Sequence, residues 1–93
     1  MMKVTVRVFG DLAEVVGNRH EMDLDDGTDV KGLTKKIAEK TGQHRQGYLG
    51  EYRVGGNELA VLVNGRNIDL IEGIRTTLKD GDEVVLLIPT MGG

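Results

Sequence analysis

Residues 80–93 read DGDEVVLLIPTMGG, and this stretch decides the fold that the sequence predicts. An Asp-Gly-Asp sequence is typical of a tight turn, and the apolar run that follows it is typical of a buried strand. Pro89 fixes its own φ and ends the pairing of the strand with its neighbours. The stretch therefore predicts a turn, a central strand and a flexible C-terminal tail over residues 89–93.

This tail is suited to a reaction at its own terminal carboxylate. Gly92 and Gly93 carry no Cβ, so an enzyme channel can enclose the backbone closely on every side. A terminal carboxylate is an anion at neutral pH, and it needs activation by ATP before a nucleophile can attack it. Glycine is abundant here, with 14 in 93 residues, so two terminal glycines alone are a weak signal. Together with the preceding strand, they predict that Gly93 reacts and that Gly92 gives access to it.

The composition predicts one domain, residues 1–93, with no thiol chemistry of its own. A hydrophobic fraction of 39% and a charged fraction of 29% fit a soluble globular protein. The net charge of -3 argues against nucleic-acid binding, which needs a dense basic patch. Cysteine is absent, which excludes disulfides and a thiol nucleophile. Neither a membrane span nor a signal peptide is apparent, so we expect a cytoplasmic protein that contacts no membrane.

The first half of the chain predicts two strands and a helix. Alternation of apolar and polar residues predicts strands at Lys3–Phe9 and Arg19–Leu24, paired as a hairpin. Helical spacing predicts a helix from about Val30 to Thr41, capped by Asp29 or Thr28. The residues expected to point inward from the two strands are Val4, Val6, Val8, His20, Met22 and Leu24.

The second half predicts three more strands, which gives the α+β class. Leu59–Val63 is a continuous apolar run, and Asn64-Gly65 is a tight-turn signal that leads into a short strand near Arg66–Ile68. The polar stretch 43–57 predicts either a long loop or a short irregular helix. The residues expected to cover an open end of the core are Leu70, Ile71 and Ile74.

One helix covers only one face of a sheet, yet both central strands carry apolar residues on both faces. We therefore predict that the second face binds a partner beside the reactive tail. The predicted partner-binding residues are Leu62, Val85, Leu87, Pro89 and Met91.

Several segments together carry a resemblance to a known family. They are VTVRVFGDLA at 4–13, GTDVKGL at 27–33, VLVNGR at 61–66, LKDGDEV at 78–84, Ile88-Pro89 and the terminal Gly92-Gly93. The last block is the most specific, because turn, strand, proline and terminal glycines occur together at the family's spacing. Over nearly all of its length, the chain resembles the β-grasp sulfur-carrier family. This family includes the small subunit of molybdopterin synthase, the thiamine-pathway sulfur carrier and the archaeal ubiquitin-like modifiers.

The resemblance implies a ubiquitin-like β-grasp fold. Its mixed sheet would have about five strands, with one main helix packed on one face and the first and last strands parallel. The resemblance also implies that an E1-like adenylating enzyme activates Gly93. In that case the chain is a carrier rather than an enzyme, and it binds no cofactor, because the partner enzyme uses the ATP.

The residues themselves agree with a carrier that has no catalytic or metal site. His20 and His44 are far apart in the sequence, and neither has an evident acidic partner. We interpret the acidic pairs Asp25-Asp26 and Asp80/Asp82 as turn residues, because Asp forms local hydrogen bonds in turns.

Three functions stay open at this point. In the first, the tail becomes a thiocarboxylate that donates sulfur inside the large subunit of molybdopterin synthase. In the second, the same carboxylate is joined to lysines of target proteins, as in a protein modifier. In the third, the chain is a non-catalytic β-grasp interaction module. We rank them in this order.

Overall fold

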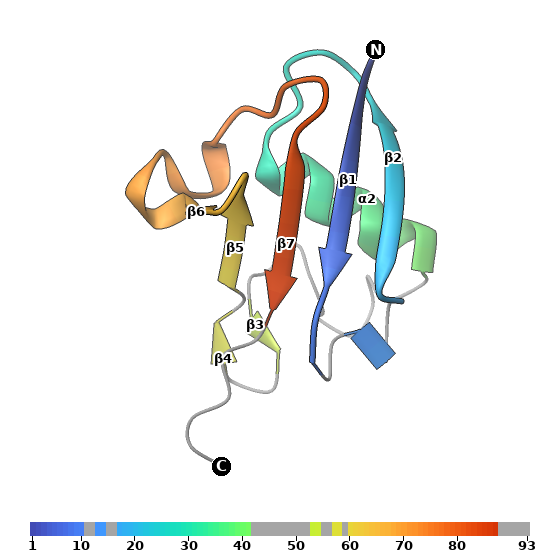
Figure 1. The fold of residues 1–93 in the computed structure, drawn as a ribbon, viewed down its shortest axis with the longest axis vertical. Helices are drawn as coiled ribbons and strands as arrows, with labels where there is room; N and C mark the ends of the chain where they lie inside the picture. Colours follow the sequence, from blue (N-terminus) through green and yellow to red (C-terminus); the bar gives the residue numbers. More distant parts are fainter. Residues whose placement is uncertain (11–12, 15–16, 42–52, 55–56, 59, 88–93) are drawn as a thin grey trace.

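The computed structural model describes residues 1–10, 13–14, 17–41, 53–54, 57–58 and 60–87. A five-stranded sheet has the strand order β2-β1-β7-β5-β6, and the helix α2 packs on one face of it (Figure 1). A short antiparallel pair, β3 with β4, forms a separate two-stranded sheet. The elements are β1 Met2–Val8, β2 Arg19–Leu24, α2 Val30–Thr41, β3 Arg53–Val54, β4 Asn57–Glu58, β5 Ala60–Val63, β6 Arg66–Asn67, the 3₁₀ helices η2 Ile68–Leu70 and η3 Gly73–Arg75, and β7 Glu83–Leu87.

The sheet is mixed, as expected, with its one parallel pair at the centre. β1 and β7 run parallel, with Val6 opposite Val84 and Val8 opposite Leu86. β1 pairs antiparallel with β2, and β5 pairs antiparallel with both β6 and β7. The predicted β-grasp architecture, with about five strands and one main helix, is confirmed.

The helix has the predicted bounds, and its cap is Asp29. The Asp29 Oδ1 atom accepts a hydrogen bond from the Gly32 backbone N–H at 2.9 Å, which satisfies a free donor of the first turn. The Thr28 hydroxyl instead donates to the Asp25 carbonyl oxygen at 2.7 Å. Of the two cap candidates, the structure therefore selects Asp29.

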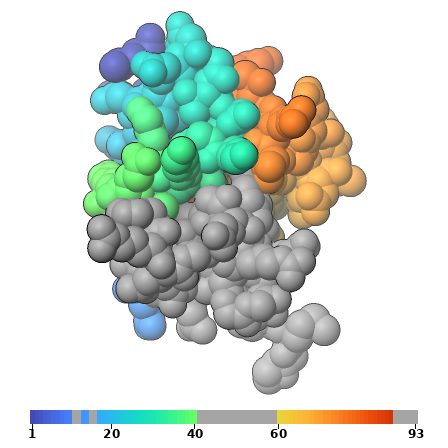
Figure 2. Space-filling view, turned by 180° about the vertical axis from the view of Figure 1, so that it is seen from behind, coloured from blue at the N-terminus to red at the C-terminus, as the bar shows by residue number. Residues whose placement is uncertain are grey.

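The core lies between α2 and the sheet face that it covers. All six strand residues predicted to point inward are buried, and so are Val30, Leu33, Ile37 and Ala38 of the helix. The opposite side of α2 exposes its lysines to solvent. Helix α2 contacts η3, and their surfaces lie side by side when the molecule is seen from the helix side (Figure 2).

One prediction about the core is wrong. Leu70, Ile71 and Ile74 are exposed by 79%, 40% and 37%, so they do not cover an open end of the core. The buried apolar residues from this part of the chain are Ile68 and Leu78. Leu70 and Ile74 lie in two short 3₁₀ helices, and Ile71 directly follows the first of them. Apolar spacing alone does not show which side of such short turns meets the core.

Leu86→Ala is expected to lower the free energy of unfolding by about 2–5 kcal/mol, because the fully buried side chain would leave a cavity. Val85→Ala is the matched control, since Val85 is the next residue on the same strand but only half-buried. We expect it to cost less than about 1 kcal/mol. Urea unfolding measures both values, and equal losses would contradict this assignment of sheet faces.

Among the described residues, no helix is long and apolar enough to cross a lipid bilayer.

Candidate functional site

The strand that leads to the predicted reactive tail is central in the sheet. β7 lies between β1 and β5 and ends at Leu87. The remaining predicted site residues, Pro89, Met91, Gly92 and Gly93, lie outside the described residues. The structure does describe the strand that precedes the tail: β7 is paired with β1 on one side and with β5 on the other, up to its last residues.

The turn that starts β7 is attached to the beginning of β1. The Lys3 N–H donates to Asp80 Oδ1 at 2.7 Å, and the Gly81 N–H donates to the Lys3 carbonyl oxygen at 2.8 Å. Gly81 has a φ of 87°, a left-handed conformation that glycine adopts without a Cβ clash. These bonds join residues far apart in sequence and hold the parallel register of β1 and β7.

The same turn is also attached to the β5–β6 hairpin. Asp82 accepts hydrogen bonds from Asn64 Nδ2 and from the Lys79 N–H, both at 2.8 Å. Asn64 Oδ1 in turn accepts from the Glu83 N–H at 2.9 Å. The hairpin turn has positive φ values of 51° at Asn64 and 83° at Gly65, as a type I′ turn requires. The interpretation of Asp80 and Asp82 as turn residues is confirmed.

A double-mutant cycle with Asn64→Ala and Asp82→Ala is expected to give a coupling energy of about 0.5–1.5 kcal/mol, the usual net value of one hydrogen bond. Urea unfolding of the two single variants and the double variant measures it. The control cycle pairs Asp82→Ala with Asn67→Ala, because Asn67 instead accepts from the Asp69 N–H. We expect this second cycle to be additive, and an equal coupling in both would contradict the direct bond.

The predicted partner-binding residues of the strands lie together on the sheet face that α2 leaves open. Leu62 is directly opposite Val85, and Ala60 is opposite Leu87. All four side chains are half-buried, whereas the alternate residues of both strands are buried. Leu62, Val85 and Leu87 therefore form one apolar strip, which we call the open-face strip.

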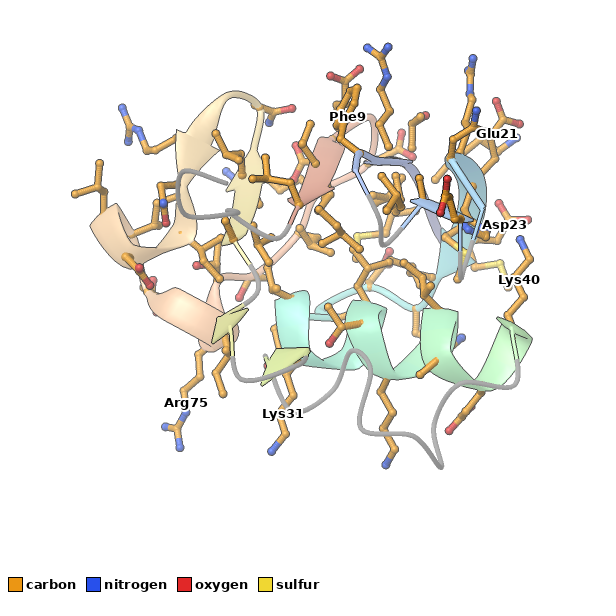
Figure 3. All side chains as sticks on the ribbon, turned by 90° about the horizontal axis from the view of Figure 1, so that it is seen from below. Phe9, Glu21, Asp23, Lys31, Lys40 and Arg75 are labelled. Carbon is orange, nitrogen blue, oxygen red and sulfur yellow. The ribbon has the colours of Figure 1, made fainter. Side chains whose placement is uncertain are left out.

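Sequence reasoning gave no role to two residues of the open face, Arg7 and Phe9. Phe9 is 46% exposed, and the Arg7 guanidinium carbon lies 5.6 Å from the centroid of its ring, within cation–π range. Arg7 is opposite Val85 in the sheet, and the Phe9 N–H donates to the Leu86 carbonyl oxygen at 3.0 Å. Alternation along 3–9 already placed Arg7 on this face. Figure 3 shows Phe9 on the side of the sheet away from α2, whereas Lys31 and Lys40 project from α2 itself.

The described residues hold no group of three or more acidic, histidine or cysteine side chains that could bind a metal. His20 is buried in β2, and His44 lies outside the described residues. The candidate site consists of the paired strand β7, which leads to the tail, and of the apolar open-face strip beside it.

Comparison with known proteins identifies the family. The model of the ThiS family matches residues 6–93, which include the end of β1, the turn at 80–82 and both terminal glycines. The chain belongs to the ThiS family. No curated protein matches it.

Solved structures resemble this ThiS-family chain over its full length. The Haloferax volcanii HVO 2177 protein has a TM-score of 0.75 at 28% identity, covering 99% of this chain and 87% of that one. Small archaeal modifier protein 1 from Methanosarcina acetivorans has a TM-score of 0.72 at 29% identity, covering 100% and 98%. A chain from the complex of subunits 1 and 2 of the molybdopterin-converting factor from Helicobacter pylori has a TM-score of 0.62 at 29% identity, covering 99% and 100%.

These comparisons agree with the resemblance seen in the sequence. They place this ThiS-family chain among ubiquitin-like sulfur carriers and modifiers with a β-grasp fold.

Proposed function

We propose that this chain is a sulfur carrier whose Gly93 carboxylate is adenylated by an E1-like enzyme and then converted to a thiocarboxylate. The observation that carries the proposal is the ThiS-family match, which runs to residue 93 and so includes Gly92 and Gly93. The paired strand β7 supports it, because it provides a fixed base from which residues 89–93 can extend.

The proposed chemistry takes place in two steps at Gly93. The carboxylate oxygen attacks the α-phosphate of ATP, which forms an acyl-adenylate and releases pyrophosphate. A hydrosulfide equivalent from the sulfur donor then attacks the acyl carbon, AMP leaves, and a thiocarboxylate remains. The partner enzyme binds the ATP, so the carrier holds no cofactor. Because activation consumes ATP, the proposal includes a cytoplasmic location.

For the recipient of the sulfur, we propose the large subunit of molybdopterin synthase. The support is the 29% identity to a chain of the Helicobacter pylori molybdopterin-converting factor, whose two subunits form a complex. In this proposal the open-face strip contacts each partner, the activating enzyme and then the large subunit, and Pro89 and Met91 follow it along the tail. Half-buried aliphatic side chains on an uncovered sheet face are suited to such a contact.

The test is the intact mass of the protein after incubation with an E1-like enzyme, ATP and a sulfur donor. We expect a gain equal to the replacement of one oxygen by sulfur, localised to Gly93 by fragmentation. Omission of ATP is the control and must leave the mass unchanged. An unchanged mass with an enzyme that activates a known carrier would overturn the sulfur-carrier proposal and favour conjugation without a stable thiocarboxylate, or a non-covalent interaction module.

A protein modifier is the second candidate. It is favoured by the 29% identity to the small archaeal modifier protein from Methanosarcina acetivorans. In this case a lysine amine of a target protein displaces the activating group at Gly93 and forms an isopeptide bond. Digestion at Arg or Lys cuts last after Lys79, so it leaves residues 80–93 on the modified lysine and not a short Gly-Gly remnant. Conjugates are therefore detected as the intact tail from residue 80 onward attached to lysine.

A further inference from the structure

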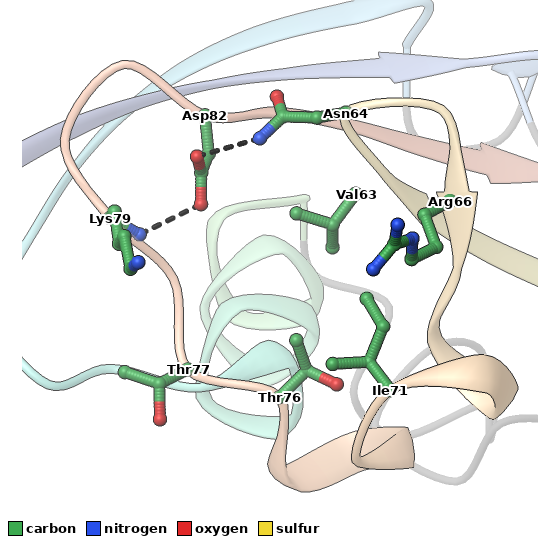
Figure 4. A pocket seen from close by; sticks show the side chains of 8 residues that line it. All are labelled: Val63, Asn64, Arg66, Ile71, Thr76, Thr77, Lys79 and Asp82. Atoms are coloured by element: carbon green, nitrogen blue, oxygen red, sulfur yellow. Dashed lines mark hydrogen bonds between the residues drawn. The ribbon is translucent and has the colours of Figure 1, made fainter.

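A pocket of about 410 Å³ lies at the start of β7, and the proposed sulfur chemistry does not use it. It opens between the β5–β6 hairpin and the segment 76–82 (Figure 4). Val63 and Ile71 supply its apolar wall, and the Lys79 and Arg66 side chains stand on either side of it. Its volume falls in the range of sites that bind small ligands or a few residues of a peptide.

The charges of this pocket favour an anionic occupant. Arg66 and Lys79 are exposed, and neither forms an ion pair with another described residue. The acidic lining residue is Asp82, and each of its carboxylate oxygens already accepts a hydrogen bond, from Asn64 Nδ2 and from the Lys79 N–H. The Asp82 carboxylate is therefore already hydrogen-bonded within the protein. The side-chain hydrogen-bond donors of Arg66 and Lys79 are available to a ligand.

The rim of the pocket favours an occupant that is also aliphatic. Ile71 lines the pocket and is part of the exposed cluster formed with Leu70 and Ile74 in and beside the two 3₁₀ helices. Apart from these three, the exposed large apolar side chains among the described residues are Met1 and Phe9. The two 3₁₀ helices contact each other, so three of these five exposed apolar side chains lie in one region, and Ile71 brings that region to the pocket. A free inorganic anion would use the cations and leave the aliphatic rim in water.

We propose that this pocket binds an acidic peptide segment of a partner protein. Carboxylates of the segment pair with Arg66 and Lys79, and an aliphatic side chain between them packs on Val63 and Ile71. The pocket lies at the first residue of β7, and the open-face strip ends at the last, roughly 13 Å away for four steps of about 3.3 Å each. An acidic partner can therefore dock here without covering Leu87 or the residues after it.

The experiment is a titration of the ¹⁵N-labelled full chain, followed by NMR, with the acetylated and amidated peptide ELLE. Its two leucines lie between two carboxylates, which matches an apolar wall between two cations. We expect shifts at the residues that line the pocket, with a dissociation constant of about 1 mM or below. Binding should weaken at high salt, because exposed charges are screened. Neither ATP nor an activating enzyme is present, so the result is independent of the chemistry at Gly93.

Matched peptides and variants decide between the possible ligands. The peptide QLLQ and the peptide ESSE, which lack the charges and the aliphatic groups respectively, should each bind at least about tenfold more weakly. Arg66→Gln and Lys79→Gln should each weaken ELLE by at least about tenfold, whereas Lys35→Gln on the exposed side of α2 should leave its binding unchanged. Unchanged amide spectra outside the pocket show that the variants are folded.

Three results would overturn the proposal. They are equal binding of QLLQ, shifts that lie outside the pocket, and inorganic phosphate binding as tightly as ELLE. The last result would identify a small-anion site instead of a peptide site.

Discussion

A chain that lacks Gly93 is expected to fold as the full chain does and to lose at least about a hundredfold in its rate of acyl-adenylate formation. The described core and the sheet pairing reach no further than residue 87, so removal of the last residue takes nothing from them. The terminal carboxylate, however, moves back by about 3.3–3.6 Å, the length of one extended residue. In-line attack on a phosphate needs the reacting atoms at about 3–3.5 Å, and the shortened tail cannot keep this separation.

ATP–pyrophosphate exchange with an E1-like enzyme measures the loss, and urea unfolding measures the fold. The matched control is Thr90→Ala, which changes one tail side chain and keeps the length of the tail. It should retain most of the exchange activity. Undiminished exchange by the shortened chain would show that Gly93 is not the residue that reacts, and the sulfur-carrier and modifier proposals would both fail.

Leu62→Asp is expected to weaken binding of the activating enzyme by about 10- to 100-fold, a change of roughly 1.4–2.8 kcal/mol. Leu62 lies on the open face directly opposite Val85, so a carboxylate there places an uncompensated charge at the centre of the proposed contact. Since the side chain is only half-buried in the free protein, we expect the free energy of unfolding to change by about 1 kcal/mol or less. Surface plasmon resonance with the immobilised enzyme measures the affinity.

Two control variants test whether the loss of affinity is specific to the open face of the sheet. Lys35→Asp introduces the same residue on the exposed side of α2 and should leave the affinity within about twofold, a change of less than 0.5 kcal/mol. Val61→Asp places the carboxylate in the buried layer between sheet and helix, and it should prevent folding at room temperature. If Leu62→Asp unfolds as Val61→Asp does, the two faces of β5 are reversed and the proposed contact is wrong.

Much of the fold could be predicted from the sequence, because its signals are local. Side chains alternate across a strand with a period of two, so Val4, Val6 and Val8 had to share one face. The apolar residues of the helix recur at the helical period, and Asp29 is a residue type that caps first turns. For the same reason the sequence predicted that Leu62, Val85 and Leu87 would be left on the second face of their strands.

Other features could not be read from the sequence, because they depend on residues that meet only in the folded chain. The bond from the Lys3 N–H to Asp80 joins positions 77 apart, and the bond between Asn64 and Asp82 joins positions 18 apart. No period or composition rule predicts such pairs. The exposed position of Leu70 was missed for a related reason: its apolar character was known, but the direction of a 3₁₀ turn was not.

The sequence by itself determined the strands of the five-stranded sheet, the helix, the turns and the family, since each rests on residue types at fixed spacing. It also determined where to expect the chemistry, at Gly92 and Gly93. Tertiary structure alone decided that β5 lies beside β7, that β3 pairs with β4, and that Asp29 rather than Thr28 caps the helix. It also decided how the turn at 80–82 ties β7 to β1 and to the β5–β6 hairpin. It alone placed Arg66, Lys79 and Ile71 around one pocket. The physical reason is that local spacing fixes the face of each side chain, whereas contacts between distant segments exist only after the whole core has formed.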